Sequence, residues 1–132
     1  MARRGDAGSI TVEVVIVLPV IMLTVLACMQ VCLLFFARSV ALAAAQQGVR
    51  AARAEGASRT AGADAARSYA ERTAGGFLHS ISASAGGDTT TVRVVVRGRS
   101  LSMVPFLESI PVTGEAAGAV ERFTVPSEGA EP

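Results

Sequence analysis

The residues with chemically reactive side chains are few and scattered in this chain of 132 residues. It has one histidine, His79, two cysteines, Cys28 and Cys32, and no lysine, since all twelve basic residues are arginine. No group of His, Cys, Asp and Glu has the spacing of a metal site, and no nucleophile has a base at a recognisable spacing. The sequence therefore predicts a protein that is not an enzyme and needs no cofactor or metal. His79 stands among serines and is predicted to lie in a solvated loop.

The net charge and the positions of the cysteines narrow the functional class of the protein further. Twelve basic and eleven acidic residues leave a formal charge of +1, which excludes a nucleic-acid binder that relies on bulk charge. Cys28 and Cys32 do not form a CxxC motif, and we interpret them as small hydrophobic side chains inside an apolar run. Oxidation between chains is the alternative for this pair.

The apolar run extends from Val14 to Ala37, twenty-four residues without a formal charge, between Glu13 and Arg38. At about 1.5 Å per residue a helix of this length covers about 36 Å, enough to cross a hydrocarbon core of about 30 Å. The run therefore predicts a single helix that spans the lipid bilayer. Gln30 within it is interpreted as a tolerated polar residue.

Two features disagree on the orientation of this helix. Arg3 and Arg4 precede the run, whereas Arg38, Arg50 and Arg53 follow it, so a count of positive charges favours a cytoplasmic C-terminus. The preceding segment is short, however, and the chain after the run has the pattern of a soluble domain with strands. We therefore predict a single-pass protein of the cell membrane, with its N-terminus cytoplasmic and its C-terminal domain outside.

A second pattern lies at the start of the chain, where a short basic leader ends at Gly8 and Glu13 stands five residues further on. This spacing resembles the class III signal of type IV pilin-like proteins, which implies cleavage between Gly8 and Ser9 by a prepilin peptidase. The string GSITVEVVIVLPVIML resembles the opening of TadE-like proteins, and so do the later strings AAAQQGVRAARAEG and AAGAVERF. The resemblance implies a minor pseudopilin or pilus-assembly protein of a tight-adherence (Flp-type) system. Its implied partners are pilin-like subunits and the pilus-assembly machinery, at the cell membrane or in a surface pilus.

The charge of Glu13 gives a separate, physical reason to expect a role in assembly. A carboxylate at the edge of the hydrocarbon must stay interfacial or meet a cation. Cleavage after Gly8 would create that cation, the α-amino group of Ser9, and Glu13 of one subunit would then neutralise the Ser9 amine of its neighbour during assembly. The alternative is that Glu13 only marks the cytosolic end of the helix.

A cleaved secretory signal is the alternative interpretation of the whole N-terminal region. MARRGDAG would be its charged segment and Ala41-Leu42-Ala43 its cleavage site, although the apolar run is longer than the usual stretch of about 7–15 residues. The product would be a secreted or cell-surface binding domain without a pilus role.

The predicted fold class is α+β, with one membrane helix that continues into a helical stem and then a small antiparallel β-sheet domain. The predicted segments are a leader, a membrane helix, a helical stem, an exported α+β region and a disordered tail, at 1–8, 9–37, 38–76, 77–125 and 126–132.

The stem is rich in alanine but interrupted by Gly48, Gly56 and Gly62, which predicts loose joints. Its small side chains form one stripe, which is either a surface for a neighbouring pilin-like helix or part of a linker. The stripe consists of Val40, Ala41, Ala44, Ala45, Gly48, Val49 and Ala52. A second helix at Ala63–Thr73 is expected to place its apolar face on the sheet.

Alternating residues predict two strands, Thr89–Arg97 and Val112–Phe123, with Val92, Val94 and Val96 on one face. Antiparallel pairing would place oppositely charged residues together on the solvent face. These residues are Arg93, Arg97, Glu115 and Glu121. The joining segment SLSMVPFLESIP is expected to cap the core, with a partner-binding surface as the alternative.

Overall fold

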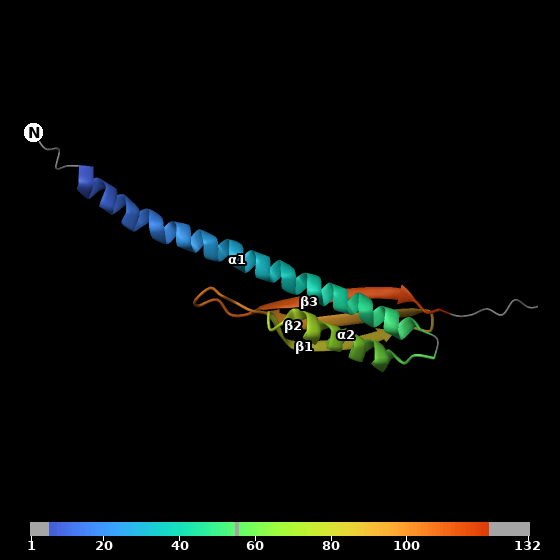
Figure 1. Ribbon diagram of the computed structural model, residues 1–132. Helices are drawn as coiled ribbons and strands as arrows, with labels where there is room; N and C mark the ends of the chain where they lie inside the picture. The colour runs from blue at the N-terminus through green and yellow to red at the C-terminus, as the bar shows by residue number, and fades with distance from the viewer. Residues whose placement is uncertain (1–5, 55, 122–132) are drawn as a thin grey trace, which may run out of the picture.

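The computed structural model describes residues 6–54 and 56–121. Its elements follow in the order α1 (Asp6–Arg53), α2 (Arg59–Ala74), β1 (Leu78–Gly87), β2 (Thr91–Ser100) and β3 (Ile110–Ala119), as Figure 1 shows. The strands form one antiparallel sheet in the order β1-β2-β3, so the predicted α+β class is confirmed. The predicted tail at 126–132 and the first five residues of the predicted leader lie outside the described residues.

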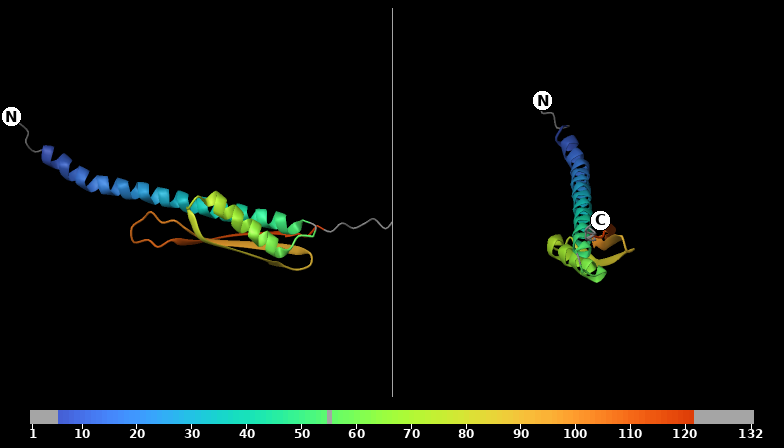
Figure 2. Two further views of the ribbon diagram at one scale, coloured as in Figure 1. Left: turned by 60° about the horizontal axis from the view of Figure 1, so that its bottom comes forward. Right: turned by 90° about the vertical axis from the view of Figure 1, so that its right-hand side faces the viewer.

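Helix α1 is continuous over 48 residues, about 72 Å at about 1.5 Å per residue. Its N-terminal part extends away from the domain, whereas its C-terminal part lies against the sheet and α2 (Figures 1 and 2). The loose joint predicted at Gly48 is wrong, because the helix continues through this glycine. The chain leaves the helix after Arg53 and turns at Gly56, whose φ of 74° favours glycine.

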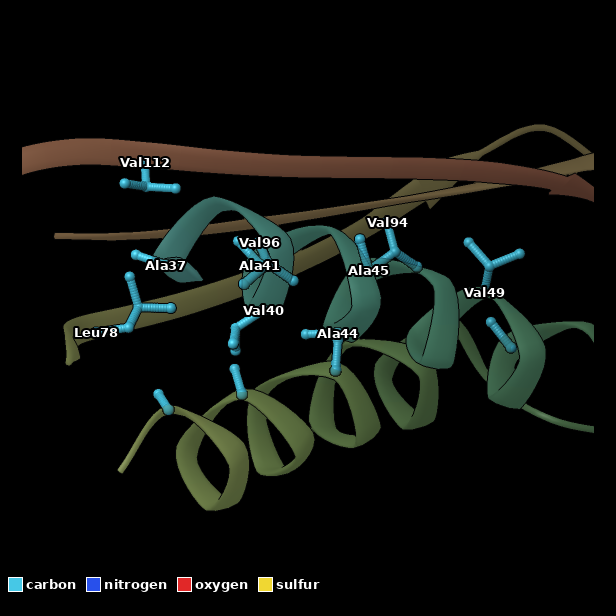
Figure 3. Close-up of a cluster of buried hydrophobic side chains, with 14 of the residues drawn as sticks. Ala37, Val40, Ala41, Ala44, Ala45, Val49, Leu78, Val94, Val96 and Val112 are labelled. Atoms are coloured by element: carbon cyan, nitrogen blue, oxygen red, sulfur yellow. The ribbon is translucent and has the colours of Figure 1, made fainter. Parts of the chain in front are cut away.

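The core lies where α1, α2 and the sheet meet (Figure 3). Both interpretations of the small-residue stripe are wrong, because its side chains are buried inside this chain and meet neither a partner nor solvent. Helix α1 contributes Ala37, Val40, Ala41, Ala44, Ala45, Val49 and Ala52 to the core, α2 contributes Ala66, Ala70 and Ala74, and the sheet contributes Leu78, Val92, Val94, Val96 and Val112. Since so many of these side chains are alanine, the elements must approach one another closely to exclude water.

Glycines make that close approach possible at two crossings. A Cβ atom on Gly48 would lie 2.7 Å from the carbonyl oxygen of Gly62, so the two helices touch through their backbones. A Cβ atom on Gly114 of β3 would lie 2.2 Å from the carbonyl carbon of Ala41, so this strand rests directly on the backbone of α1. Any side chain at these positions would separate the layers.

Helix α2 has clear start and stop signals. The Ser58 hydroxyl accepts a hydrogen bond from the Ala61 N–H at 3.1 Å, and Gly75 ends the helix in the left-handed conformation. The predicted second helix is therefore present, with longer bounds. Its buried face contacts α1 as well as β1, so the expectation of packing on the sheet alone is corrected.

The two predicted strands are present as β2 and β3, with Val92, Val94 and Val96 buried. Of the predicted charge pairs, Arg93 and Glu115 form an ion pair at 2.8 Å. Arg97 is exposed on the sheet but lies opposite Thr113 rather than opposite a glutamate. Glu121 instead pairs with Arg53 of α1 at 3.3 Å, which joins the end of the sheet to the end of the helix.

Strand β1 has no counterpart in the predicted strands. It contains His79, so the prediction of a loop for this residue is wrong, and His79 lies half-buried opposite Arg99. Serine, alanine and glycine fill most of β1, and these residues give no β-branched signal. The hairpin to β2 is closed by Asp88, whose side chain accepts hydrogen bonds from Thr90 and Thr91.

Candidate functional site: the apolar helix and the loop beside it

The N-terminal part of α1 is apolar on all sides and carries no packed partner. It is the one described helix that is long and apolar enough to cross a membrane, and none of its qualifying 18-residue window is buried. A core helix of a soluble protein would bury such a surface. This exposure marks α1 as a membrane anchor.

Gly8 and Ser9 lie in the first turns of α1, and Glu13 follows one turn after Ser9. All three residues are exposed. Because residues four apart share a helix face, the structure places the Ser9 and Glu13 side chains on the same side of α1. The chain thus presents the predicted processing site and the predicted assembly residue together at the free end of the helix.

Glu13 also borders a shallow apolar groove on α1. The groove has a volume of about 420 Å³ and is lined by Ile10, Glu13, Val14, Val17, Leu18 and Ile21. The spacing of these residues is that of one helix face, on which a second apolar helix can pack. Glu13 is the only charged side chain in the lining.

Gln30 is the one amide residue of the apolar run, and the structure gives it a specific role. It is 6% exposed, its Oε1 accepts a hydrogen bond from the Met103 N–H at 2.9 Å, and its Nε2 donates to the Leu101 carbonyl at 3.3 Å. The interpretation of Gln30 as a merely tolerated polar residue is therefore wrong. The signal available in the sequence was that it is the one amide side chain within the run.

The partner of Gln30 is the loop between β2 and β3, residues 101–109, which we call the β2–β3 loop. The expectation that this segment caps the core is wrong, because its large side chains point outward. Phe106 is fully exposed, and Met103 and Leu107 are 46% and 45% exposed. Both views in which the loop is clear show it extending along α1 towards the helix N-terminus (Figure 1 and Figure 2, left).

Contacts at its base fix where this loop starts and ends. Arg99 donates hydrogen bonds to both the hydroxyl and the carbonyl oxygen of Ser109, each at 2.7 Å. The Leu101 N–H donates to the Phe77 carbonyl at 3.0 Å, and the Phe77 ring meets Phe36 of α1 edge to face, with centroids 5.8 Å apart. The β2–β3 loop is thus attached to both the sheet and the helix.

The remaining candidates for chemistry stay apart from one another. Cys28 and Cys32 are exposed on the apolar part of α1, and their predicted role as small hydrophobic residues stays a prediction. Within residues 6–54 and 56–121, no three His, Cys, Asp or Glu side chains are grouped to hold a metal ion. Hydrogen bonds from the Thr90 hydroxyl and from the N–H groups of Thr90 and Thr91 lower the pKa of Asp88, which acts in hairpin closure.

Taken together, an exposed apolar N-terminal helix and a small α+β domain packed on its far end define a membrane-anchored protein. The family model described as TadE-like protein matches residues 8–50, which confirms the TadE-like resemblance over α1. The match begins at Gly8, includes Glu13 and ends within the later string AAAQQGVRAARAEG, whereas the string AAGAVERF lies beyond it. This family is associated with tight-adherence pilus systems and with structural or assembly roles. No curated protein and no solved structure matches the chain significantly.

Proposed function

We propose that this protein is a minor pseudopilin or pilus-assembly protein of a tight-adherence system, anchored by α1 with its N-terminus cytoplasmic and its domain outside. The observation that carries the proposal is the free end of α1, an exposed apolar helix whose one charged groove residue is Glu13. Such a surface suits lateral packing against other pilin-like helices inside a membrane or filament. The family match over the same residues supports this use.

Processing by a prepilin peptidase between Gly8 and Ser9 is part of the proposal. This cut would leave the whole apolar helix on the mature chain, together with a new α-amino group at Ser9. The charge of that amine lies one helix turn from Glu13 of its own chain, and it is equally available to Glu13 of a neighbour packed with an axial stagger. Pairing between subunits would favour one register of assembly over others.

The packing of α1 argues against the secretory alternative. A cut after Ala43 would remove the helix segment that bears Ala37, Val40 and Ala41, and all three residues are at most 4% exposed in the core. It would also remove the backbone on which Gly114 rests. A domain released in this way would expose the apolar underside of its sheet, so the structure favours a retained helix.

Glu13→Gln tests the assembly role, because it keeps the side-chain shape and removes only the charge. The variant should reach the membrane at normal abundance and should be cut after Gly8, as N-terminal sequencing of the mature chain would show. It should nevertheless lose crosslinks to pilin-like subunits or lower surface piliation, because the neighbouring amine has lost its counter-charge at the edge of the hydrocarbon.

The matched control is Asp64→Asn, the same carboxylate-to-amide change at an exposed position of α2. This control should leave crosslinking and piliation unchanged. If Glu13→Gln also retains both at wild-type levels, Glu13 only marks the end of the helix. A mature chain that begins at Ala44 would replace the pilus proposal by the secreted binding domain.

A further inference from the structure

We infer that the β2–β3 loop is a second membrane contact, in which Phe106 and its apolar neighbours insert into the lipid interface beside α1 and Gln30 positions the loop there. This inference rests on the membrane anchorage of α1 but not on the pilus role. The occupant of the exposed apolar loop is thus the lipid bilayer that surrounds the helix. It is a surface separate from the groove at Glu13.

The position of the β2–β3 loop relative to α1 supports a contact with the membrane. About 20 helical residues cover a hydrocarbon core of about 30 Å. Twenty residues counted from Val14, after the charge of Glu13, end at Leu33, so Gln30 falls in the last turn of this segment. The hydrogen bonds from Gln30 therefore hold Leu101 and Met103 at the level of the hydrocarbon edge, and the rest of the loop extends from there along α1 towards the helix N-terminus (Figure 1).

The composition of the loop is the second argument. Residues 101–107 carry no formal charge, and charged side chains appear only beside them, at Arg99 and Glu108. Water is a poor environment for the exposed Met103, Phe106 and Leu107 side chains, whereas the interface of a bilayer accommodates aromatic and aliphatic groups of this kind. The exposed apolar surface of the loop continues the exposed apolar surface of α1.

The turn that presents Phe106 is the third argument. The Leu107 N–H donates to the Val104 carbonyl at 3.2 Å, Pro105 holds the second position, and Phe106 has a φ of 69° at the third. This third position of a type II turn normally takes glycine, because a side chain there is strained. The structure instead places the large aromatic side chain of Phe106 at this turn of the loop, where it is fully exposed and is not packed in the protein interior. Strain that supports an outward-facing aromatic group points to contact with something outside the chain.

The hydrogen bonds of the loop set a limit on its depth. Leu101, Met103 and Leu107 have protein partners for their N–H groups, and Pro105 has no N–H group. The remaining N–H groups of the loop need water or lipid headgroups, which excludes the loop backbone from the hydrocarbon. The apolar run of α1 is longer than the hydrocarbon core, so a tilt of α1 brings the loop backbone to the interface, where only its side chains enter the hydrocarbon. Gln30 itself is acceptable near the hydrocarbon because both ends of its amide are hydrogen-bonded.

Tryptophan fluorescence tests this contact, since the chain contains no tryptophan and each substitution gives one reporter. The full chain is reconstituted in phosphatidylcholine vesicles whose acyl chains are brominated either near the headgroup or near the chain end. The Phe106→Trp variant should lose about half or more of its emission with the shallow bromolipid and less with the deep one, as an interfacial side chain would. Ala117→Trp, on the exposed face of β3, is the control and should lose about a tenth or less.

A third variant separates failure of the loop contact from failure of the anchor. Leu18→Trp lies in the exposed apolar part of α1 and should be quenched by the deep bromolipid. Quenching of Leu18→Trp without quenching of Phe106→Trp overturns the loop contact alone, whereas absence of both overturns the anchorage and the loop contact together. Protection of Phe106→Trp from aqueous acrylamide only after pilin-like subunits are added would assign the loop to a protein partner instead.

The role of Gln30 is tested in the same assay by Gln30→Leu in the Phe106→Trp background. This change removes both hydrogen bonds to the loop and keeps the helix surface apolar. Shallow bromolipid quenching should fall by about half, because the loop then samples positions away from the membrane. Unchanged quenching would overturn Gln30 as the positioning residue.

Discussion

The contact between β3 and α1 predicts that Gly114→Ala destabilises the domain. The added Cβ atom would lie 2.2 Å from the Ala41 carbonyl carbon and 2.4 Å from the Leu42 nitrogen. Both are backbone atoms of a continuous helix, so neither can rotate away. The strand and the helix must separate by about 1.3 Å, the difference between 2.2 Å and the about 3.5 Å of an ordinary carbon contact.

The expected change in the free energy of unfolding of Gly114→Ala follows from two opposing effects. Overpacking of a core costs about 1–3 kcal/mol, and an obstacle formed by backbone places Gly114→Ala at about 3 kcal/mol. Replacing a strand glycine by alanine contributes about 0.5–1 kcal/mol in the other direction, by reducing the entropy of the unfolded chain. The free energy of unfolding should therefore fall by about 2 kcal/mol, which lowers Tm by about 8–16 °C in a domain of this size.

Gly86→Ala is the matched control, because Gly86 also lies within a strand and a Cβ atom there would meet nothing within 4 Å. This control should be neutral or raise the free energy of unfolding by up to about 1 kcal/mol. Thermal unfolding of the full chain in detergent micelles measures both variants, followed by near-ultraviolet circular dichroism of the single tyrosine, Tyr69, which packs against the core. Equal Tm values for the two variants would refute the direct contact of β3 with the α1 backbone.

Two further predictions concern the sheet and its hairpin. Val94→Asp should reduce the free energy of unfolding by about 3–5 kcal/mol, because Val94 is fully buried and the new carboxylate has no partner. Arg97→Glu on the solvent face should change the free energy of unfolding by about 0.5 kcal/mol or less. Equal protease resistance in the two variants would contradict the sheet assignment. Asp88 has a folded-state pKa below its ordinary value, through hydrogen bonds from Thr90 and Thr91, so its contribution to stability is present above the unfolded-state pKa and is lost as pH falls through the folded-state pKa. Asp88→Asn should therefore make Tm less sensitive to acid, and an unchanged dependence of Tm on pH would exclude this role.

The parts of the fold that the sequence predicts well are those fixed by local composition. The uncharged run after Glu13 can only be stable as a helix in lipid, and the alternation of Val92, Val94 and Val96 specifies a strand with one buried face. Strand β1 could not be found in this way, because its serines and alanines fit a strand only when a neighbouring strand supplies the hydrogen bonds. Its existence depends on pairing with β2.

Contacts between distant residues account for most of the other differences. Small side chains on α1 permit close packing without specifying the partner, so the sequence could not distinguish a second subunit from α2 and the sheet of the same chain. The hydrogen bonds of Gln30 join residues 71 and 73 positions apart, and the Arg53 bond to Glu121 spans 68 positions. No periodicity of the sequence encodes such pairings. The predicted roles of Gly8, Ser9 and Glu13 at the free end of α1 depend on partners outside the chain, so the fold alone leaves them as predictions.

The absence of a hinge between anchor and domain has a mechanical consequence. Helix α1 continues without a break from the exposed apolar segment into the core, where Gly48 and Gly114 bring α2 and β3 onto its backbone. Two densely packed layers resist sliding, because each glycine contact admits only one registration of the backbones. A change in the tilt of α1 in the membrane must therefore rotate the whole domain by the same angle. Since Gln30 ties the β2–β3 loop to the helix at the level where the domain begins, an interfacial Phe106 would restrict that tilt, and the anchor would fix how the domain faces its partners.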